Sequence, residues 1–340
     1  MKGVQVVLGQ VGQTDVAAKI ENGILQDLIV EQGDIVRVGT ILRGKVDRPL
    51  KGQGGVIIKT ALGNGFLRKA KSLSEGQVVT VQVSGLAEDG KAFPVTTRVI
   101  FKSRFAIVTP FAPGLNISRQ IRDDDLRDQL DLLAKEGMDG SDFGLIIRSA
   151  ANAADAEDVA EDIAAMRSVA EQLMADTGTD LDVQLDGDGP SDWAWREWPD
   201  ADDVQSGPAA LEDCGVLDVL DSLESAKVPL GSGHLFVEPT RALAAIDVNT
   251  GGDTSPSAGL KTNLAACPEI LRQLRLRGIG GQITIDFAPL AKKDRRAVET
   301  ALRKACRNCS VDTEFIGWTP LGHAELKRKR ERVFLDVTQL

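Results

Sequence analysis

Short runs of alternating hydrophobic and polar residues dominate the first hundred positions of the chain. Three of them, at 4–7, 15–20 and 24–30, are separated by glycine and asparagine turns and predict short strands. Further runs follow between residues 39 and 108, again divided by glycines. Five or more short strands at regular spacing are typical of a small β-barrel, here of the OB type.

Helical periodicity begins after this region. Residues 118–137 predict a short helix, 143–147 a buried strand, and 154–174 a long amphipathic helix with one apolar face. Residues 176–210 are rich in Asp, Gly, Pro and Ser, and we expect them to form loops. For the three tryptophans in that stretch, at 193, 195 and 198, we expect a packing role.

The last part of the chain has the clearest pattern. Residues 234–238 predict a strand, and 242–249 predict a second strand that is almost wholly apolar and therefore central in its sheet. A helix at about 262–277, with Leu264, Ile270, Leu271 and Leu274 on its apolar face, leads to a third strand at 282–287. Strand, helix, strand in this order predicts a βαβ unit with adjacent or near-adjacent parallel strands.

Each of the two strands in that unit has an aspartate near its carboxyl end, Asp247 in the first and Asp286 in the second. Sites in open α/β sheets form at the carboxyl ends of strands, and neighbouring strands lie about 4.8 Å apart. Two such carboxylates can share one divalent ion such as Mg²⁺, and Asn249, two residues further on, points to the same side. The alternative is that each aspartate caps the next turn. The chemistry alone allows a phosphatase, a nuclease or another metal-assisted phosphoryl reaction.

The charge distribution changes the picture more than the net charge of −10. Acidic residues crowd the middle of the chain, whereas basic residues prevail from Lys261 onward and recur in the predicted barrel. Basic surfaces of this kind can bind phosphate backbones locally, or they can be solvated helix faces. Phe66 and Phe93 are the main aromatic candidates for stacking on bases in the barrel.

Cysteines, apolar runs and the first residues narrow the setting. Four cysteines are too few for a disulfide scaffold, and Cys306 and Cys309, although spaced like metal ligands, form a lone pair where zinc prefers four ligands. We therefore expect ordinary thiols. The sequence has no apolar run of about 18 residues and its first residues lack a signal-peptide pattern. The prediction is a cytoplasmic protein without a membrane partner.

Five stretches around the two aspartates occur in a specific order, at 245–249, 262–264, 269–277, 280–287 and 296–299. In sequence and spacing these stretches resemble the catalytic core of the ribonuclease E/G family. The likeness continues to 326–330 and is traceable upstream through 44–46, 65–67, 96–97, 117–119 and 144–148, with least support between about 150 and 230. The chain thus resembles a short, minimal form of that family.

The resemblance implies an α/β multidomain architecture. An OB-fold RNA-binding domain (36–103) would be inserted in an RNase-H-like domain (1–35 and 179–224). A 5′-end sensor region (104–178) and a DNase-I-like α/β catalytic domain (225–340) would complete it.

The resemblance also implies roles for individual residues. Asp247 and Asp286 match the aspartates that bind Mg²⁺ (with Mn²⁺ as an alternative), and Asn249 matches the asparagine that assists the attack. Arg148 matches an arginine that binds a 5′-monophosphate, with Ser149 where threonine is usual. Phe66 and Lys91 match residues that hold RNA near the scissile bond. The alternatives from the residues alone are a salt bridge from Arg148 to the acidic helix that follows it, a place in the barrel core for Phe66 and a solvated turn for Lys91.

Two departures limit the resemblance. A second aromatic of the OB surface is replaced near Val56, and the cysteine segment that links family dimers through zinc is absent. We therefore expect no zinc. A homo-oligomer stays open, but a zinc-linked dimer is not expected.

The expected function is a Mg²⁺-dependent endoribonuclease that cuts single-stranded RNA, leaves 5′-phosphate and 3′-hydroxyl ends and is stimulated by a 5′-monophosphate. Its expected setting is RNA decay or rRNA and tRNA maturation. The alternatives are a non-catalytic RNA-binding regulator of the same fold, and a metal phosphodiesterase that acts on DNA or on a small molecule.

Overall fold

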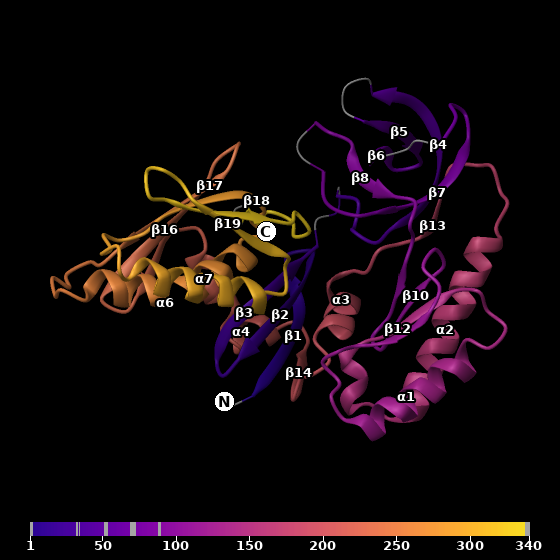
Figure 1. Cartoon of the computed structure of the whole chain (residues 1–340), viewed down its shortest axis with the longest axis horizontal. Coiled ribbons are helices and arrows are strands. Elements are labelled where there is room, and N and C mark those ends of the chain that lie inside the picture. Colours follow the sequence, from indigo (N-terminus) through magenta and orange to yellow (C-terminus); the bar gives the residue numbers. More distant parts are fainter. Residues whose placement is uncertain are drawn as a thin grey trace. The chain divides into compact units, whose positions relative to one another are not determined.

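The computed structural model describes residues 3–31, 33, 35–50, 54–68, 73–87 and 90–336. The chain divides into two compact units. The first combines Met1–Gln32 with Asp202–Leu340, and the second is Gly33–Ala201. Because the first unit contains both ends of the chain, the second is an insertion within it (Figure 1).

A closed five-stranded barrel forms the first half of the second unit. Its strands are β4 (Ile41–Leu50), β5 (Gly55–Thr60), β6 (Gly63–Arg68), β7 (Val78–Val83) and β8 (Phe93–Thr96). They pair in the order β4-β5-β6-β8-β7, and β7 returns to pair with β4. Alternate side chains point inward, so that Leu42, Ile58 and Val81 are fully buried. The barrel is consistent with the predicted OB fold.

A small sheet and two helices make up the rest of this unit. The sheet has the order β11-β12-β10-β9. Its strands are β9 (Phe101–Lys102), β10 (Ala106–Thr109), β11 (Leu115–Ile117) and β12 (Gly144–Ile147). Helix α1 (Asp124–Gly137) begins where the Asp123 side chain accepts a hydrogen bond from the Leu126 amide, and α2 (Ala156–Ala175) buries Val159 and Ile163 as its periodicity predicts. A short 3-10 turn, η1 (Ser149–Ala153), lies between β12 and α2.

The loop prediction for 176–210 is wrong. This stretch forms β13 (Asp182–Leu185), α3 (Pro190–Glu197) and β14 (Asp203–Ser206). Its strands leave many side chains partly or fully exposed, so they need few apolar residues and their pattern resembles that of a loop. The packing prediction holds for Trp198, which is buried, but not for Trp195, whose residue is 66% exposed.

The amino-terminal strands of the first unit form where the sequence predicts them. β1 (Val4–Val11), β2 (Thr14–Glu21) and β3 (Ile24–Val30) form an antiparallel sheet, and β14 adds to it parallel to β1. Helices α4 (Ala210–Asp213) and α5 (Val216–Ser222) pack against this sheet through Leu211, Val216 and Leu220.

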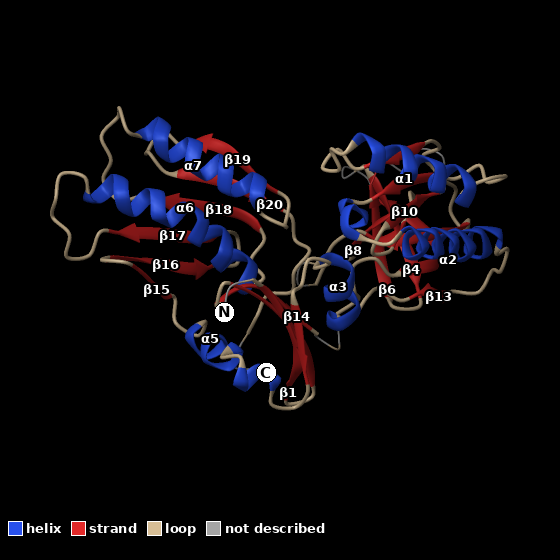
Figure 2. Cartoon of the chain, turned by 90° about the horizontal axis from the view of Figure 1, so that it is seen from below, coloured by secondary structure: helices blue, strands red, loops and turns tan. Residues whose placement is uncertain are grey.

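A six-stranded sheet completes the first unit. It has the order β15-β16-β17-β18-β20-β19. The strands are β15 (Lys227–Leu230), β16 (Gly233–Pro239), β17 (Ala244–Asn249), β18 (Gly281–Asp286), β19 (Thr313–Trp318) and β20 (Ala324–Arg328). Helices α6 (Ala258–Leu276) and α7 (Arg295–Asn308) lie side by side against one face of it (Figure 2).

The core between this sheet and its helices comes from alternate strand residues. Ile246 and Ile285 are at most 2% exposed and pack with Ile270 and Leu271 of α6, as expected. Leu264 does not join them, because it is 37% exposed. β17 and β18 are adjacent and parallel, which confirms the predicted βαβ unit.

Candidate active site

The two aspartates at the ends of the central strands lie directly beside each other. β17 and β18 pair in parallel with Ala244 opposite Ile283, and three residues later Asp247 is the register partner of Asp286. Residues paired in this way sit about 4.8 Å apart and direct their side chains to the same face of the sheet. The backbone hydrogen bonds of the strand pair therefore set the spacing of the two carboxylates.

The pair projects from the face of the sheet that α6 and α7 do not cover. Along β17, Ile246 and Val248 are buried against the helices, whereas Asp247 between them is exposed. The same alternation in β18 buries Ile285 and exposes Asp286, whose side chain is 65% accessible. Two carboxylates on an exposed face are accessible to a large polymer as well as to water.

Asn249 joins the pair from the same strand. Its Nδ2 donates a hydrogen bond of 2.8 Å to Oδ2 of Asp247, as expected for residues two apart on one face. This contact fixes the rotamer of one carboxylate and leaves the amide oxygen of Asn249 as a further acceptor.

Both histidines of the chain, which belong to none of the motifs above, flank the carboxylates. Nε2 of His323 lies 3.8 Å from Oδ1 of Asp286. His234 is the register partner of Asn249, and its ring meets that of Phe236, the register partner of Asp247, edge-on at 5.3 Å. Because histidine occurs only twice in the chain, each histidine was a candidate site residue from the sequence alone.

A buried asparagine holds the segment that follows Asp286. Asn263 of α6 is fully buried, and its Nδ2 donates to the carbonyl oxygen of Ala288 at 2.9 Å. Its Oδ1 accepts from the Ala288 amide at 3.0 Å. Two hydrogen bonds to one residue, two positions after Asp286, fix the course of the chain as it leaves β18.

Glycine is required where β16 begins beside the end of β17. A Cβ at Gly233 would lie 2.3 Å from the carbonyl oxygen of Asn249, which is closer than any real contact. A Cβ at Gly251, which has a φ of +61°, would come equally close to the backbone oxygen of Ser232. These glycines allow the turn after β17 to pack against β16 while Asn249 keeps its place.

The donor set suits a hard divalent cation. No group of three or more His, Cys, Asp or Glu residues that could hold a metal occurs among the described residues. A pair of carboxylates with a neighbouring amide oxygen, open to water, is nevertheless what Mg²⁺ accepts, since it keeps several water ligands. The residues present therefore fit Mg²⁺ better than zinc, which prefers a closed set of nitrogen and sulfur ligands.

Phe66 and Lys91, predicted to contact RNA, lie outside the barrel core, whereas the stacking prediction for Phe93 is wrong, because Phe93 is buried in that core. Phe66 on β6 is half-buried, is absent from the core cluster and lies over Gly55 of β5, where an added Cβ would collide with the ring. Lys91 is exposed. Val56, near the replaced aromatic, points into the core, so its neighbour Ile57, the register partner of Phe66, is the residue on the outer side.

Arg148 lies within a network of internal contacts in the second unit. One of its terminal nitrogens, Nη1, donates to the carbonyl oxygens of Ser103, Arg104 and Arg196, and the other, Nη2, donates to Glu197 at 2.8 Å. Ser149 beside it is exposed. The sequence anticipated a salt bridge as an alternative, but its partner is on α3 and not on the helix that follows Arg148.

Cys309 at the end of α7 lies among arginines. Its sulfur accepts hydrogen bonds from Arg328 at 3.1 Å and from Arg275 at 3.5 Å. Burial raises the pKa of this thiol, but the charges of these two arginines outweigh burial and leave the pKa below its usual value. Burial raises the pKa of Cys306 to about 11. Positive neighbours at Cys309 oppose a cation there.

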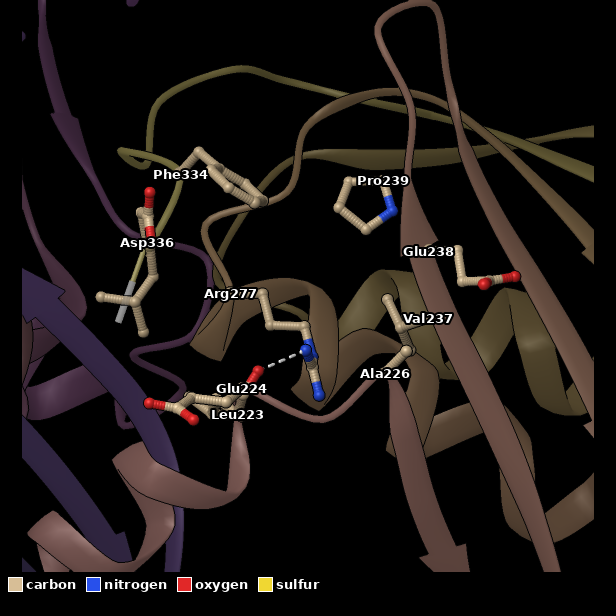
Figure 3. Close-up of a pocket in the computed structure, with 10 residues that line it drawn as sticks. Leu223, Glu224, Ala226, Val237, Glu238, Pro239, Arg277, Phe334 and Asp336 are labelled. Carbon is tan, nitrogen blue, oxygen red and sulfur yellow. Dashed lines mark hydrogen bonds between the residues drawn. The ribbon is translucent and has the colours of Figure 1, made fainter. Parts of the chain in front are cut away.

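A pocket of about 400 Å³ lies at the other end of β16, away from the carboxylates. Arg277 extends into it from the end of α6 and donates to the carbonyl oxygen of Leu223 at 2.8 Å (Figure 3). Arg277 also donates to the carbonyl oxygen of Ser225 at 2.8 Å. The pocket also includes Val237 and Pro239 of β16, but neither Asp247 nor Asp286.

No helix in the described part of the chain has the length and apolar character needed to cross a membrane.

Comparison with known proteins gives a consistent result. The family described as "Ribonuclease E/G family" matches residues 101–184 and 201–331. Ribonuclease G of Salmonella typhimurium is 28% identical over 93% of this chain and 77% of its own length. Ribonuclease G of Escherichia coli K12 is 27% identical over 94% and 78%, respectively. Ribonuclease E of Nostoc sp. is 26% identical over 96% of this chain, which spans only 56% of that relative.

The matched residues include the whole constellation of Asp247, Asn249, Asp286 and His323, together with Arg148. They cover most of the chain, and the alignments with the relatives extend over nearly all of it. The chain belongs to the ribonuclease E/G family.

Proposed function

We propose that this protein is a Mg²⁺-dependent endoribonuclease that cuts single-stranded RNA and leaves 5′-phosphate and 3′-hydroxyl ends. The observation that carries the proposal is the in-register pair of Asp247 and Asp286 on the open face of the six-stranded sheet. Membership of a ribonuclease family and the names of the relatives support an endoribonuclease. RNA decay or rRNA and tRNA processing is the proposed setting.

The residues of the constellation have separate tasks. Asp247 and Asp286 would hold Mg²⁺, with Mn²⁺ as an alternative; the ion activates water and stabilises charge on the phosphate. The hydrogen bond from Asn249 orients Asp247, and its free amide oxygen can position water for the attack. Phe236 lies beside Asp247 and offers an apolar surface to a sugar or base of the substrate. We expect no role for zinc.

Two further surfaces support RNA as the substrate. Phe66 and Lys91 lie on the outside of the barrel, where an aromatic ring and an ammonium group can bind a base and a phosphate. Arg148 and Ser149 would respond to a 5′-monophosphate and so stimulate cleavage. The finer domain assignment, with RNase-H-like and DNase-I-like parts, belongs to this proposal as well.

Cleavage of a fluorescent single-stranded RNA with and without Mg²⁺ tests the proposal. Asp247→Asn and Asp286→Asn should each abolish cutting, because a neutral amide loses the charge that holds the ion, while RNA binding stays largely intact. Glu314→Gln is the matched control, since Glu314 is an exposed acid on the edge strand β19 of the same sheet. Full activity of either aspartate variant would refute the metal site, and RNA binding without cleavage by the unmodified chain would favour a non-catalytic regulator.

A further inference from the structure

Glu197, the last residue of α3, is surrounded by three positively charged side chains. Its carboxylate lies 2.7 Å from Nζ of Lys102, 2.8 Å from Nη2 of Arg148 and 2.7 Å from Nε of Arg196. None of the four side chains is more than 33% accessible. Contacts between ions that are shielded from water are stronger than those on an open surface.

The ion cluster around Glu197, which contains Lys102, Arg148 and Arg196, has more positive than negative charge. Arg196 also contacts Asp188, so three cations share two carboxylates. Burial lowers the pKa of Lys102. The charges of Arg148 and Arg196 lower this pKa further, and the opposing effect of Glu197 is too small to restore its usual value. Burial acts to raise the pKa of Glu197, but the same cations hold it below its usual value. The carboxylate is therefore ionised, and the cluster still favours additional negative charge.

The carboxylate comes from a segment that the family does not match. Lys102 and Arg148 lie within the matched residues 101–184, whereas Asp188, Arg196 and Glu197 lie between the two matched stretches. Helix α3 lies in this unmatched segment and places an acid against an arginine of the matched stretch.

We propose that Glu197 acts as an internal anion that occupies the place at Arg148 where a 5′-phosphate would bind, and thereby weakens the response of the enzyme to the RNA 5′ end. This inference rests on the proposed role of Arg148 as the phosphate-binding residue. It makes Glu197 a residue that determines substrate preference, and the ligand it competes with is a terminal phosphate monoester.

The contacts of Arg148 allow such an exchange. Its Nη1 stays bound to three carbonyl oxygens, so the guanidinium is held in place whichever anion is present. Only the Nη2 contact would pass from Glu197 to phosphate. A phosphate monoester carries a charge of about −1.5 to −2 and three acceptor oxygens, so it can displace a singly charged carboxylate. The displacement breaks the contact between Arg148 and Glu197, and the loss of this contact weakens the net binding of the phosphate.

The test compares the unmodified chain with Glu197→Gln on one RNA oligonucleotide that carries either a 5′-monophosphate or a 5′-hydroxyl. The measured quantity is the ratio of kcat/KM for the two ends. Glu197→Gln should raise this ratio about fivefold or more, because the competing charge is gone. Glu171→Gln is the matched control, since it removes an acid from an exposed pair with Arg167 in the same unit and should leave the ratio unchanged.

Fluorescence anisotropy in metal-free buffer gives the same comparison without catalysis. Glu197→Gln should bind the 5′-phosphorylated oligonucleotide more tightly relative to the 5′-hydroxyl form, and this result supports the proposal even if no RNA is cut. A failure to cut RNA would refute the nuclease assignment and not this proposal. If Glu197→Gln does not fold, Glu197→Asp, which withdraws the carboxylate, should show a smaller rise in both measurements. An unchanged or lower preference for the 5′-phosphate in the folded variant would overturn the proposal.

Discussion

Replacing Asn263 by alanine should loosen the segment that positions Asp286. The change removes two hydrogen bonds to Ala288, whose amide and carbonyl are then left without a partner at a residue that is 2% exposed. A buried polar group without a partner costs roughly 1–3 kcal/mol, so the two together should lower the free energy of unfolding by about 3 kcal/mol.

Activity should fall with stability, because Ala288 lies two residues after Asp286. A shift of about 1 Å in a reacting group can cost on the order of a hundredfold in rate. We expect Asn263→Ala to retain RNA binding and to lose at least about tenfold in kcat/KM.

Urea unfolding and hydrogen exchange measure the two parts of this prediction. The Ala288 amide should exchange slowly in the unmodified chain and quickly in Asn263→Ala. Asn308→Ala, an exposed asparagine at the end of α7, is the control and should change stability by no more than about 0.5 kcal/mol. A loss below about 1 kcal/mol in Asn263→Ala with protection at Ala288 intact would refute the reasoning.

Three further predictions concern other parts of the chain. Gly233→Ala should reduce the rate of RNA cleavage about tenfold or more, because the new Cβ displaces the backbone at Asn249. Gly252→Ala is the control, since a Cβ there meets nothing within 4 Å and should leave the rate unchanged. Equal cleavage rates for the two variants would contradict this account. The pKa of Glu197 is below its usual 4.5, so its contribution to stability is present above that pH and lost as the pH falls below it; Glu197→Gln should therefore show a weaker loss of stability in acid, and parallel pH curves would be evidence against the ion cluster. Cys309, with a pKa lowered by neighbouring arginines, should react first with iodoacetamide; mass spectrometry that finds another cysteine alkylated first would contradict it.

The part of the fold that holds the two aspartates was predictable because its signals are local and strong. Each central strand runs apolar until its aspartate, and the helix between them has a clear apolar face. That pattern fixes a parallel pair, and the parallel pair places Asp247 beside Asp286. The barrel was predictable for the same reason, since regularly spaced strands and glycine turns leave few other solutions.

The elements that the sequence did not reveal depend on distant partners. β14 is an exposed strand that pairs with β1, about two hundred positions earlier in the chain, so its own composition carries no signal. Glu197 reads as one acid among many in an acidic stretch until α3 brings it to Arg148. His323 and Asn263 act through contacts between separate elements, and the spacing of residues along the sequence does not predict such contacts.

The pairing of β13 with β4 has a consequence for anyone who wishes to produce the barrel alone. Ile41, Leu42 and Arg43 of β4 are register partners of residues in β13, and the Arg43 side chain binds Asp182. A fragment that stopped after the last barrel strand would expose this stretch of backbone and leave the Arg43 cation without the carboxylates of Asp176 and Asp182. Free strand edges of this kind promote self-association, so the fragment to express is the continuous insertion up to residue 201, in which the returning strand seals the edge.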